Sequence, residues 1–132
     1  MKTPGRIQIV TKKAPGAIGP YSQAMRAGNF LFCSGQIPLH PETGTIVGDT
    51  IETQTEQVMK NVQGLLESEG LTSIDIVKIT VFLKNMGEFP KFNETYQKFV
   101  QSPYPARSTV EVVRLPKDVM VAVDCIAVYP NE

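Results

Sequence analysis

The sequence has no tryptophan, a single histidine and no excess of charge of either sign. Its 13 basic and 13 acidic residues cancel. This argues against a nucleic-acid-binding protein, because such proteins carry a positive surface that offsets the phosphate charge. The one histidine, His40, lies in the stretch PLHPETG, where we expect a solvated loop residue. We therefore do not expect a Ser-His-Asp or Cys-His catalytic arrangement.

Cysteine is also scarce, since the chain has only Cys33 and Cys125, which lie far apart and form no CxxC motif. Two distant cysteines and one histidine cannot supply the ligands of a zinc site. Both cysteines lie in apolar runs, which favours buried free thiols over a disulfide. The stretch GAIGPY lacks the GK[ST] element of a phosphate-binding loop, and no clear strand leads into it.

Long hydrophobic runs are missing too. The longest apolar runs are far too short to cross a bilayer. The first ten residues, MKTPGRIQIV, lack the apolar core of a signal peptide. We therefore expect no membrane association and a cytoplasmic location.

The residues that are present suit one folded unit. At 132 residues and 42% hydrophobic composition, the chain is long enough for a real core, and we expect a single domain over 1–132. Alternation and helical spacing predict an α+β fold in the order β-β-β-α-β-α-β-β, with both helices on one face of the sheet. The expected elements are a strand at 6–10, a hairpin at 21–35 turned at 27–29, a helix from about 51 to 70, a strand at 74–85, a helix from 89 to 99, and strands at 107–114 and 119–129.

The last strand predicts more than one copy of the chain. Both faces of VMVAVDCIAVY are largely apolar, and IDIVKITVFL is similar. Two helices can cover only one face of a sheet, so the other face must be buried elsewhere. We expect an obligate homo-oligomer.

One residue stands out in the stretch YPARSTVEVVRLPKDV. Arg107 opens a strand in which Val110, Val112 and Val113 indicate burial, although a guanidinium is costly to desolvate. It could pair with Glu111 on the same strand face. Its planar fork could instead hold an anion, most naturally a carboxylate, through two charge-assisted hydrogen bonds. Spacing alone favours the structural pair.

Four stretches resemble one known family. PARSTVEVVRLPKDV is similar to the PARS-x-VEVARLPKD signature of the RidA/YjgF family of reactive-intermediate (enamine/imine) deaminases, also called endoribonuclease L-PSP-like. Three further stretches agree in the same order, and together they cover nearly the whole chain: APGAIGPYSQA (14–24), FCSGQIPLHPETG (32–44) and VFLKNMGEFPKFNETYQKF (81–99).

The resemblance implies a fold and an activity. The implied fold is a chorismate-mutase-like α+β domain with a mixed sheet, which trimerises and forms pockets between subunits. Members hydrolyse 2-aminoacrylate and related enamines or imines to 2-keto acids and ammonia, as in 2-iminobutanoate/2-iminopropanoate deaminases. They use neither cofactor nor metal, so the implied partners are small 2-imino or 2-keto acids and further copies of the chain.

The same resemblance implies site residues. Arg107 would bind the substrate carboxylate, and Tyr21 would face the pocket across the subunit boundary. The remaining implied pocket residues are Ser34 and Gly35, with backbone N–H groups available to the ligand, Asn93, and Thr109 where many relatives have cysteine. Structural alternatives stay open: Tyr21 could be an aromatic residue at the pocket rim, Ser34 and Gly35 could form a turn at the strand end, and Asn93 could be a surface residue of the helix.

The last strand departs from the family pattern. Active members usually read E-x-E there, and the first glutamate points into the pocket near the attacking water. This chain has Ala122 at the first position and Asp124 at the second, on the same strand face. Two functions therefore stay open. One is a deaminase whose water is positioned by Asp124, Tyr21 or backbone. The other is a small-carboxylate-binding regulatory or interaction protein that has lost hydrolysis, since some members are linked to purine-gene regulation, translation inhibition or RNA cleavage.

Overall fold

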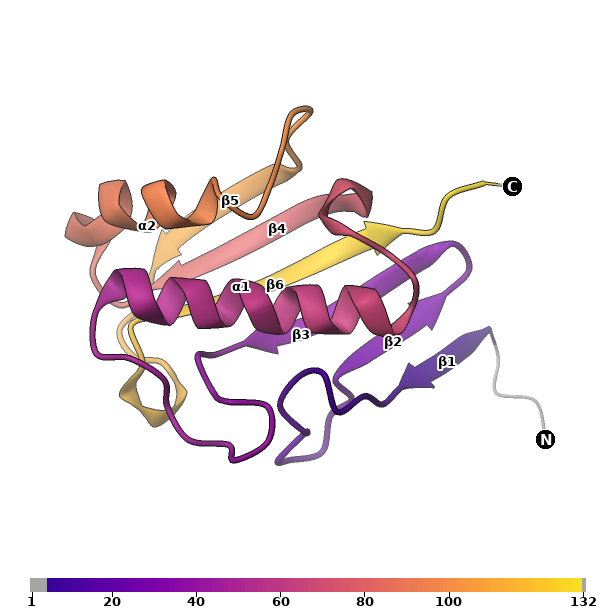
Figure 1. Ribbon diagram of the computed structural model, residues 1–132, viewed down its shortest axis with the longest axis horizontal. Helices are drawn as coiled ribbons and strands as arrows, with labels where there is room; N and C mark the ends of the chain where they lie inside the picture. Colours follow the sequence, from indigo (N-terminus) through magenta and orange to yellow (C-terminus); the bar gives the residue numbers. More distant parts are fainter. Residues whose placement is uncertain (1–4, 132) are drawn as a thin grey trace.

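A six-stranded sheet with two helices on one face makes up the described part of the chain, residues 5–131 of a computed structural model (Figure 1). The strand order is β1-β2-β3-β6-β4-β5, and only β4 and β5 run parallel. This confirms the predicted α+β class and element order. The elements are β1 (Arg6–Ile9), β2 (Ala24–Ala27), β3 (Phe30–Gln36), α1 (Ile51–Ser68), β4 (Ile76–Leu83), α2 (Phe89–Tyr96), β5 (Ala106–Glu111) and β6 (Val121–Val128).

Local sequence signals set the ends of α1. The Thr50 side chain accepts a hydrogen bond from the Thr53 N–H, and the Thr53 hydroxyl accepts one from the Thr50 N–H. This reciprocal capping box satisfies backbone donors that a helix start leaves free. At the other end Gly70 has a φ of 70°, which glycine adopts without strain just beyond a helix.

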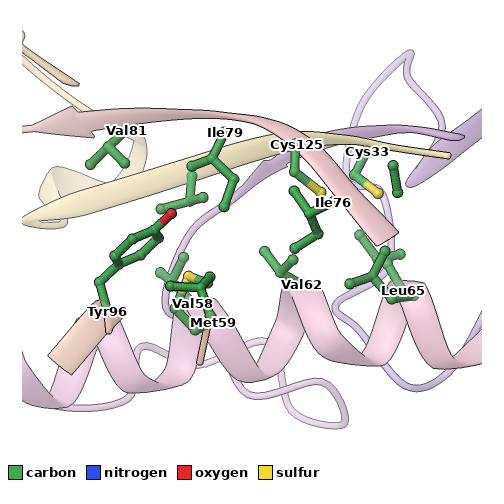
Figure 2. Packing of buried hydrophobic residues seen from close by; sticks show 14 of the residues in the cluster. Cys33, Val58, Met59, Val62, Leu65, Ile76, Ile79, Val81, Tyr96 and Cys125 are labelled. Atoms are coloured by element: carbon green, nitrogen blue, oxygen red, sulfur yellow. The ribbon is translucent and has the colours of Figure 1, made fainter. Parts of the chain in front are cut away.

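The core lies between the helices and the sheet (Figure 2). From α1, Val58, Val62 and Leu65 face the sheet, and each is no more than 1% exposed. The sheet presents alternate residues to them, including Ile79 and the two cysteines. Both cysteines are free and buried, as predicted.

The β2–β3 hairpin carries two of the predicted site residues. It turns at Gly28 and Asn29, within the expected turn, and the φ of 58° at Gly28 suits glycine. Against β6, Cys33 pairs with Cys125 but Gln36 pairs with Val123, so β3 has one extra residue there. This β-bulge holds Ser34 and Gly35 at the strand end.

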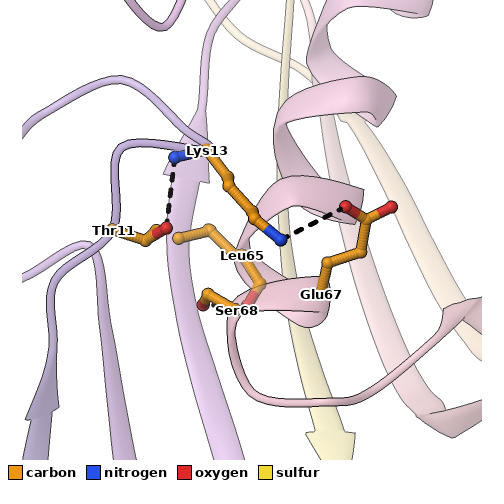
Figure 3. Close-up of polar contacts among 5 residues, drawn as sticks. All are labelled: Thr11, Lys13, Leu65, Glu67 and Ser68. Atoms are coloured by element: carbon orange, nitrogen blue, oxygen red, sulfur yellow. Dashed lines mark hydrogen bonds and ion pairs between the residues drawn. The ribbon is translucent and has the colours of Figure 1, made fainter.

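The segment between β1 and β2 is fixed against α1. The Lys13 carbonyl lies so close to Gly64 that a Cβ at position 64 would be 2.0 Å from its oxygen. Beside this contact, the Lys13 ammonium lies 4.0 Å from the Glu67 carboxylate, and the Lys13 N–H donates to the Thr11 hydroxyl (Figure 3). Glycine at 64 therefore lets the loop seat directly on the helix.

Several strands are shorter in the structure than predicted, most clearly β4 and β5. The strand expected at 74–85 is β4, Ile76–Leu83, and the strand expected at 107–114 is β5, which ends at Glu111, the partner of Leu83. Beyond that pair the chain turns outwards. Burial of Val113 was a wrong expectation, since it is 99% exposed, and Val110 is 43% exposed.

The face of the sheet away from the helices is uncovered in one protomer. Phe30, Phe32 and Val110 are each more than 40% exposed there. Lys78 and Asp124 are polar residues on the same face, and Lys78 Nζ donates to Ser108 Oγ at 3.1 Å. Separately, neither α1 nor α2 combines the length and the apolar character that a bilayer-spanning helix needs.

Candidate functional site

Arg107 lies on the helix-facing side of β5, at the edge of the sheet and in register with Ile79 of β4. Glu111 lies on the same strand face but is not its partner. The Glu111 carboxylate instead accepts the Met86 N–H at 2.8 Å. Within residues 5–131, no carboxylate comes within 4 Å of the Arg107 guanidinium. The ion pair between Arg107 and Glu111 that the sequence spacing favoured is therefore absent.

One face of α2 holds the guanidinium instead. Arg107 Nη1 donates to Asn93 Oδ1 at 2.9 Å. The Arg107 Cζ lies 5.3 Å from the ring centroid of Phe89 and 4.9 Å from that of Tyr96. These three α2 residues are spaced i, i+4 and i+7, which places them on one helix face. The cation is thus fixed by two rings and one amide, none of which neutralises its charge.

A cavity of about 430 Å³ opens beside this arginine. Its volume lies within the range of small-molecule sites. Polar amides and aromatic rings surround the single cation. The lining residues are Asn93, Tyr96, Gln97, Val100, Tyr104, Pro105 and Arg107.

Tyr96 is the most buried phenol of this cavity, with 6% of its surface exposed. Burial raises the pKa of the Tyr96 phenol above its usual range, and the neighbouring Arg107 charge opposes this shift only in part. In Figure 2 the side chain extends from α2 towards the sheet. The hydroxyl therefore stays protonated at neutral pH.

A second group of predicted residues gathers at the end of β3. Tyr21 is 50% exposed, and its hydroxyl accepts the Ile18 N–H at 3.4 Å. Together with Ser34, Tyr21 lines a separate hollow of about 600 Å³ that also contains Arg6. Gly35 is exposed, and a Cβ added there would meet no atom within 4 Å.

Ser34 is already hydrogen-bonded within the chain. Its N–H donates to the Gln23 carbonyl at 3.0 Å, and its hydroxyl donates to the Ser22 carbonyl. The expectation that the Ser34 N–H is free for a ligand is therefore wrong. The Ser34 hydroxyl oxygen still has lone pairs that can accept a hydrogen bond.

The two groups do not meet within one protomer. Arg107, Ile79, Cys125 and Cys33 form one row across four strands, so Arg107 lies three strand spacings, about 14 Å, from Cys33, the residue before Ser34. Asn93 and Arg107 are brought together, whereas Tyr21, Ser34 and Gly35 form a separate set.

Ala122 and Asp124 lie on the uncovered face of the sheet, paired with Phe82 and Thr80 of β4. Arg107 is on the opposite face, so the sheet itself separates Asp124 from the arginine of the same protomer. Burial raises the pKa of the Asp124 carboxyl, and hydrogen bonding by Thr80 and the Lys78 charge act in the opposite direction.

Thr109 lies two residues beyond Arg107 on the same strand face, in register with Val81. Its Oγ1 is buried and has no hydrogen-bond partner within the described residues. An unpaired buried hydroxyl costs stability unless something else bonds to it. Among the predicted site residues, Thr109 is the one with a buried side-chain polar atom that has no partner in the described residues.

The described residues contain no group of three or more histidine, cysteine, aspartate or glutamate side chains that could hold a metal ion. His40 lies exposed in its loop, where its Nδ1 accepts the Glu42 N–H at 3.1 Å. Arg107 is the one side chain in the lining of the cavity beside α2 that is charged at neutral pH.

Comparison with known proteins identifies the family. The model of the family described as Endoribonuclease L-PSP matches residues 11–129. The chain belongs to this family, which includes RidA and YjgF. The sequence resemblance is thus confirmed.

Family members of similar sequence carry different names. The 2-iminobutanoate/2-iminopropanoate deaminase of Escherichia coli is 46% identical over 123 residues, covering 91% of this chain and 95% of that protein. A Lactococcus lactis protein named as a regulator, AldR, is 52% identical over 120 residues, covering 90% and 94%. The crystal structure of E. coli TdcF with bound serine superposes with a TM-score of 0.88 at 42% identity, covering 94% of this chain and 99% of that one.

Sequence reasoning missed the aromatic part of the site. Phe89 and Tyr96 were predicted only as part of the helix from 89 to 99, and Gln97, Val100 and Tyr104 carried no predicted site role. The signal was available in the i, i+4, i+7 spacing of Phe89, Asn93 and Tyr96. This spacing puts the three residues on one helix face, but the sequence does not show that this face packs against β5.

Proposed function

We propose that the protein is a cofactor-free hydrolytic deaminase of small enamine and imine acids of the 2-aminoacrylate class, giving 2-keto acids and ammonia. One observation carries the proposal: Arg107 is held by Asn93 and two aromatic rings at a cavity wall, with no carboxylate partner of its own. A fixed and unneutralised guanidinium is suited to bidentate binding of a carboxylate. The serine named in the TdcF structure also carries a carboxylate.

The reaction depends more on the position of the substrate relative to the attacking water than on strong acid–base groups. After the enamine tautomerises, the imine carbon is electrophilic, and water must add to it before ammonia leaves. Arg107 would fix the carboxylate and thereby place this carbon at the cavity. Holding the reacting atoms in a defined geometry can supply a large part of the acceleration.

We propose that a second copy completes the site, within a homotrimer. The separation of about 14 Å between Arg107 and Cys33, which precedes Ser34, prevents one protomer from presenting all the predicted residues to one ligand. The uncovered apolar face supplies a surface for assembly. Tyr21, Ser34 and Gly35 of a neighbouring copy would then close the Arg107 cavity.

The test is the loss of 2-aminoacrylate generated by a serine dehydratase, with the wild type and Arg107→Ala side by side. We expect the wild type to accelerate the loss, and the variant to lose both deamination and pyruvate binding by about 100-fold or more, because two charge-assisted hydrogen bonds disappear. Arg107→Lys should fall between them, since it keeps the charge without the fork.

Arg114→Ala is the matched control, because Arg114 is exposed in the turn after β5. It should behave as wild type. If Arg107→Ala retained both deamination and pyruvate binding, the site would lie elsewhere.

A regulatory function is the second candidate. It is favoured by Ala122, which removes the carboxylate found at this position in active members, and by the position of Asp124 across the sheet from Arg107. The relative named as a regulator supports the same possibility. Pyruvate binding that depends on Arg107, without any acceleration by the wild type, would favour this function. The zero net charge gives no support to an RNA-directed role.

A further inference from the structure

The cavity beside Arg107 has an unusual set of lining residues for a hydrolytic site. Its lining contains no aspartate, glutamate, histidine, cysteine or lysine. Two of the lining side chains carry a hydroxyl group, Tyr96 and Tyr104. Addition of water and release of ammonia both move protons, and these two phenols are the hydroxyl groups that the protomer carrying Arg107 itself presents in the lining.

Burial and contact distinguish the two phenols. Tyr104 is 66% exposed, whereas Tyr96 is 6% exposed. The Tyr96 ring lies 4.9 Å from the Arg107 Cζ, and it stacks on Phe92 at a centroid separation of 5.4 Å and an angle of 23°. Tyr96 is therefore held rigidly beside the group that would bind the substrate carboxylate.

The position of Tyr96 suits a proton relay. The imine carbon is bonded directly to the carboxylate carbon, so a carboxylate on Arg107 brings the reacting carbon close to this phenol. A protonated phenol can donate its proton and accept another at the same oxygen. Burial keeps the phenol in this neutral form, since it raises the pKa of Tyr96.

We propose that the Tyr96 hydroxyl is the proton relay of the Arg107 site, which makes it a catalytic residue of the proposed deaminase and rests on that function. In the first step, water oxygen bonds to the imine carbon, the phenol oxygen takes one water proton, and the phenol gives its own proton to the nitrogen. In the second, the phenol takes the proton of the new hydroxyl and again gives its own to the nitrogen. The C–N bond breaks, the C=O bond forms and ammonia leaves. Tyrosine is restored after each step, and nothing is oxidised or reduced.

The first experiment compares Tyr96→Phe with the wild type in the 2-aminoacrylate assay. Phenylalanine keeps the ring that contacts Arg107 and Phe92, so pyruvate affinity and KM should stay within about twofold. Loss of the relay should lower kcat by about 100-fold, the lower end of what general acid–base catalysis contributes. Tyr129→Phe removes a phenol that does not line the cavity and that donates to the Glu69 carboxylate, so it should leave kcat unchanged.

The results of this comparison distinguish a failure of the Tyr96 relay from a failure of the proposed deaminase function. If the wild type accelerates the reaction and Tyr96→Phe keeps kcat within twofold, the relay is overturned and the deaminase stands. Equal losses of kcat and pyruvate binding would also overturn the relay, because they would show a purely structural role. If the wild type itself gives no acceleration, the proposed function and the relay are both overturned.

A pH profile provides a second reading, which is useful if Tyr96→Phe unfolds. Incorporation of 3-fluorotyrosine keeps the hydroxyl but lowers the pKa of the phenol. We expect the alkaline limb of kcat to move to lower pH, because the relay works only while the phenol is protonated. The same replacement in Tyr21→Phe, Tyr104→Phe and Tyr129→Phe backgrounds should still move the limb, which leaves Tyr96 as the tyrosine responsible. An unmoved limb would contradict the relay.

Discussion

Arg107 has unusual surroundings for a half-buried charged side chain. A half-buried guanidinium normally has an acid beside it, because burial of an unpaired charge is costly. Here Asn93 accepts one hydrogen bond and two rings flank the cation, while the nearby Glu111 is used by the Met86 N–H. The charge is thus held in place but left available to an anion.

Asp124 yields a prediction about stability and pH. Burial raises the pKa of its carboxyl in the folded chain. Below the pKa that Asp124 has in the unfolded chain, the carboxyl is protonated in both states and does not lower the free energy of unfolding. As the pH rises through the pKa in the folded chain, the buried carboxyl ionises and the free energy of unfolding falls. We expect Asp124→Asn to unfold at a higher temperature than the wild type at pH 7, and at the same temperature at pH 3.

Thermal unfolding at the two pH values measures this difference. Glu42→Gln, which alters an exposed carboxylate, is the matched control and should unfold like the wild type. A lower unfolding temperature for Asp124→Asn at pH 7 would show that the ionised carboxylate is stabilising, contrary to the account.

Among the secondary-structure elements, the loop between β1 and β2 shows how a site residue is positioned. Gln23 is 4% exposed, and its side-chain amide donates to the carbonyls of Thr11, Ala14 and Pro15 at 2.9–3.1 Å. Its Oε1 accepts the Thr11 N–H at 2.8 Å. One buried side chain thus fixes the loop that leads to Tyr21.

Gln23→Leu should therefore destabilise the protein by about 2–4 kcal/mol, because several buried backbone groups lose their partner. Chemical denaturation measures the loss. Gln101→Leu makes the same change at an exposed position and should alter the free energy of unfolding little. A Gln23→Leu protein as stable as the wild type would show that these hydrogen bonds do not hold the loop.

The element order was predictable because each signal is local. The turn at Gly28, the helical spacing from Ile51 to Leu66 and the stop at Gly70 all correspond to observed features. The end of β5 was missed, because it is set by its partner β4, which ends at Leu83. A strand's length depends on its neighbour, and local sequence does not show the neighbour.

The sequence predicted which residues belong to the site, but not which of them lie close together in one protomer. Family resemblance supplied Arg107, Asn93 and Tyr21, and the structure brings the first two together. The separation of Tyr21 follows from the strand order, which puts β6 and β4 between β3 and β5. Such an order arises from long-range pairing, so no local pattern in the sequence reports it.

The whole molecule presents two separate groups of predicted site residues and an uncovered apolar face. The α2 cavity lies at one edge of the sheet and the Tyr21 group lies towards the other. Closed cyclic assembly, in which one patch of each copy meets a different patch of the next, joins such halves. The account therefore requires that Arg107 of one copy and Tyr21 of another serve the same substrate.

Complementation between two variants tests this claim most directly. Arg107→Ala and Tyr21→Ala, each strongly impaired alone, are unfolded together in equal amounts, refolded and assayed for 2-aminoacrylate loss. The account predicts recovery of roughly a quarter of wild-type activity, because that share of sites receives an intact half from each kind of subunit. No recovery, from mixed assemblies of wild-type mass, would contradict a site shared between subunits.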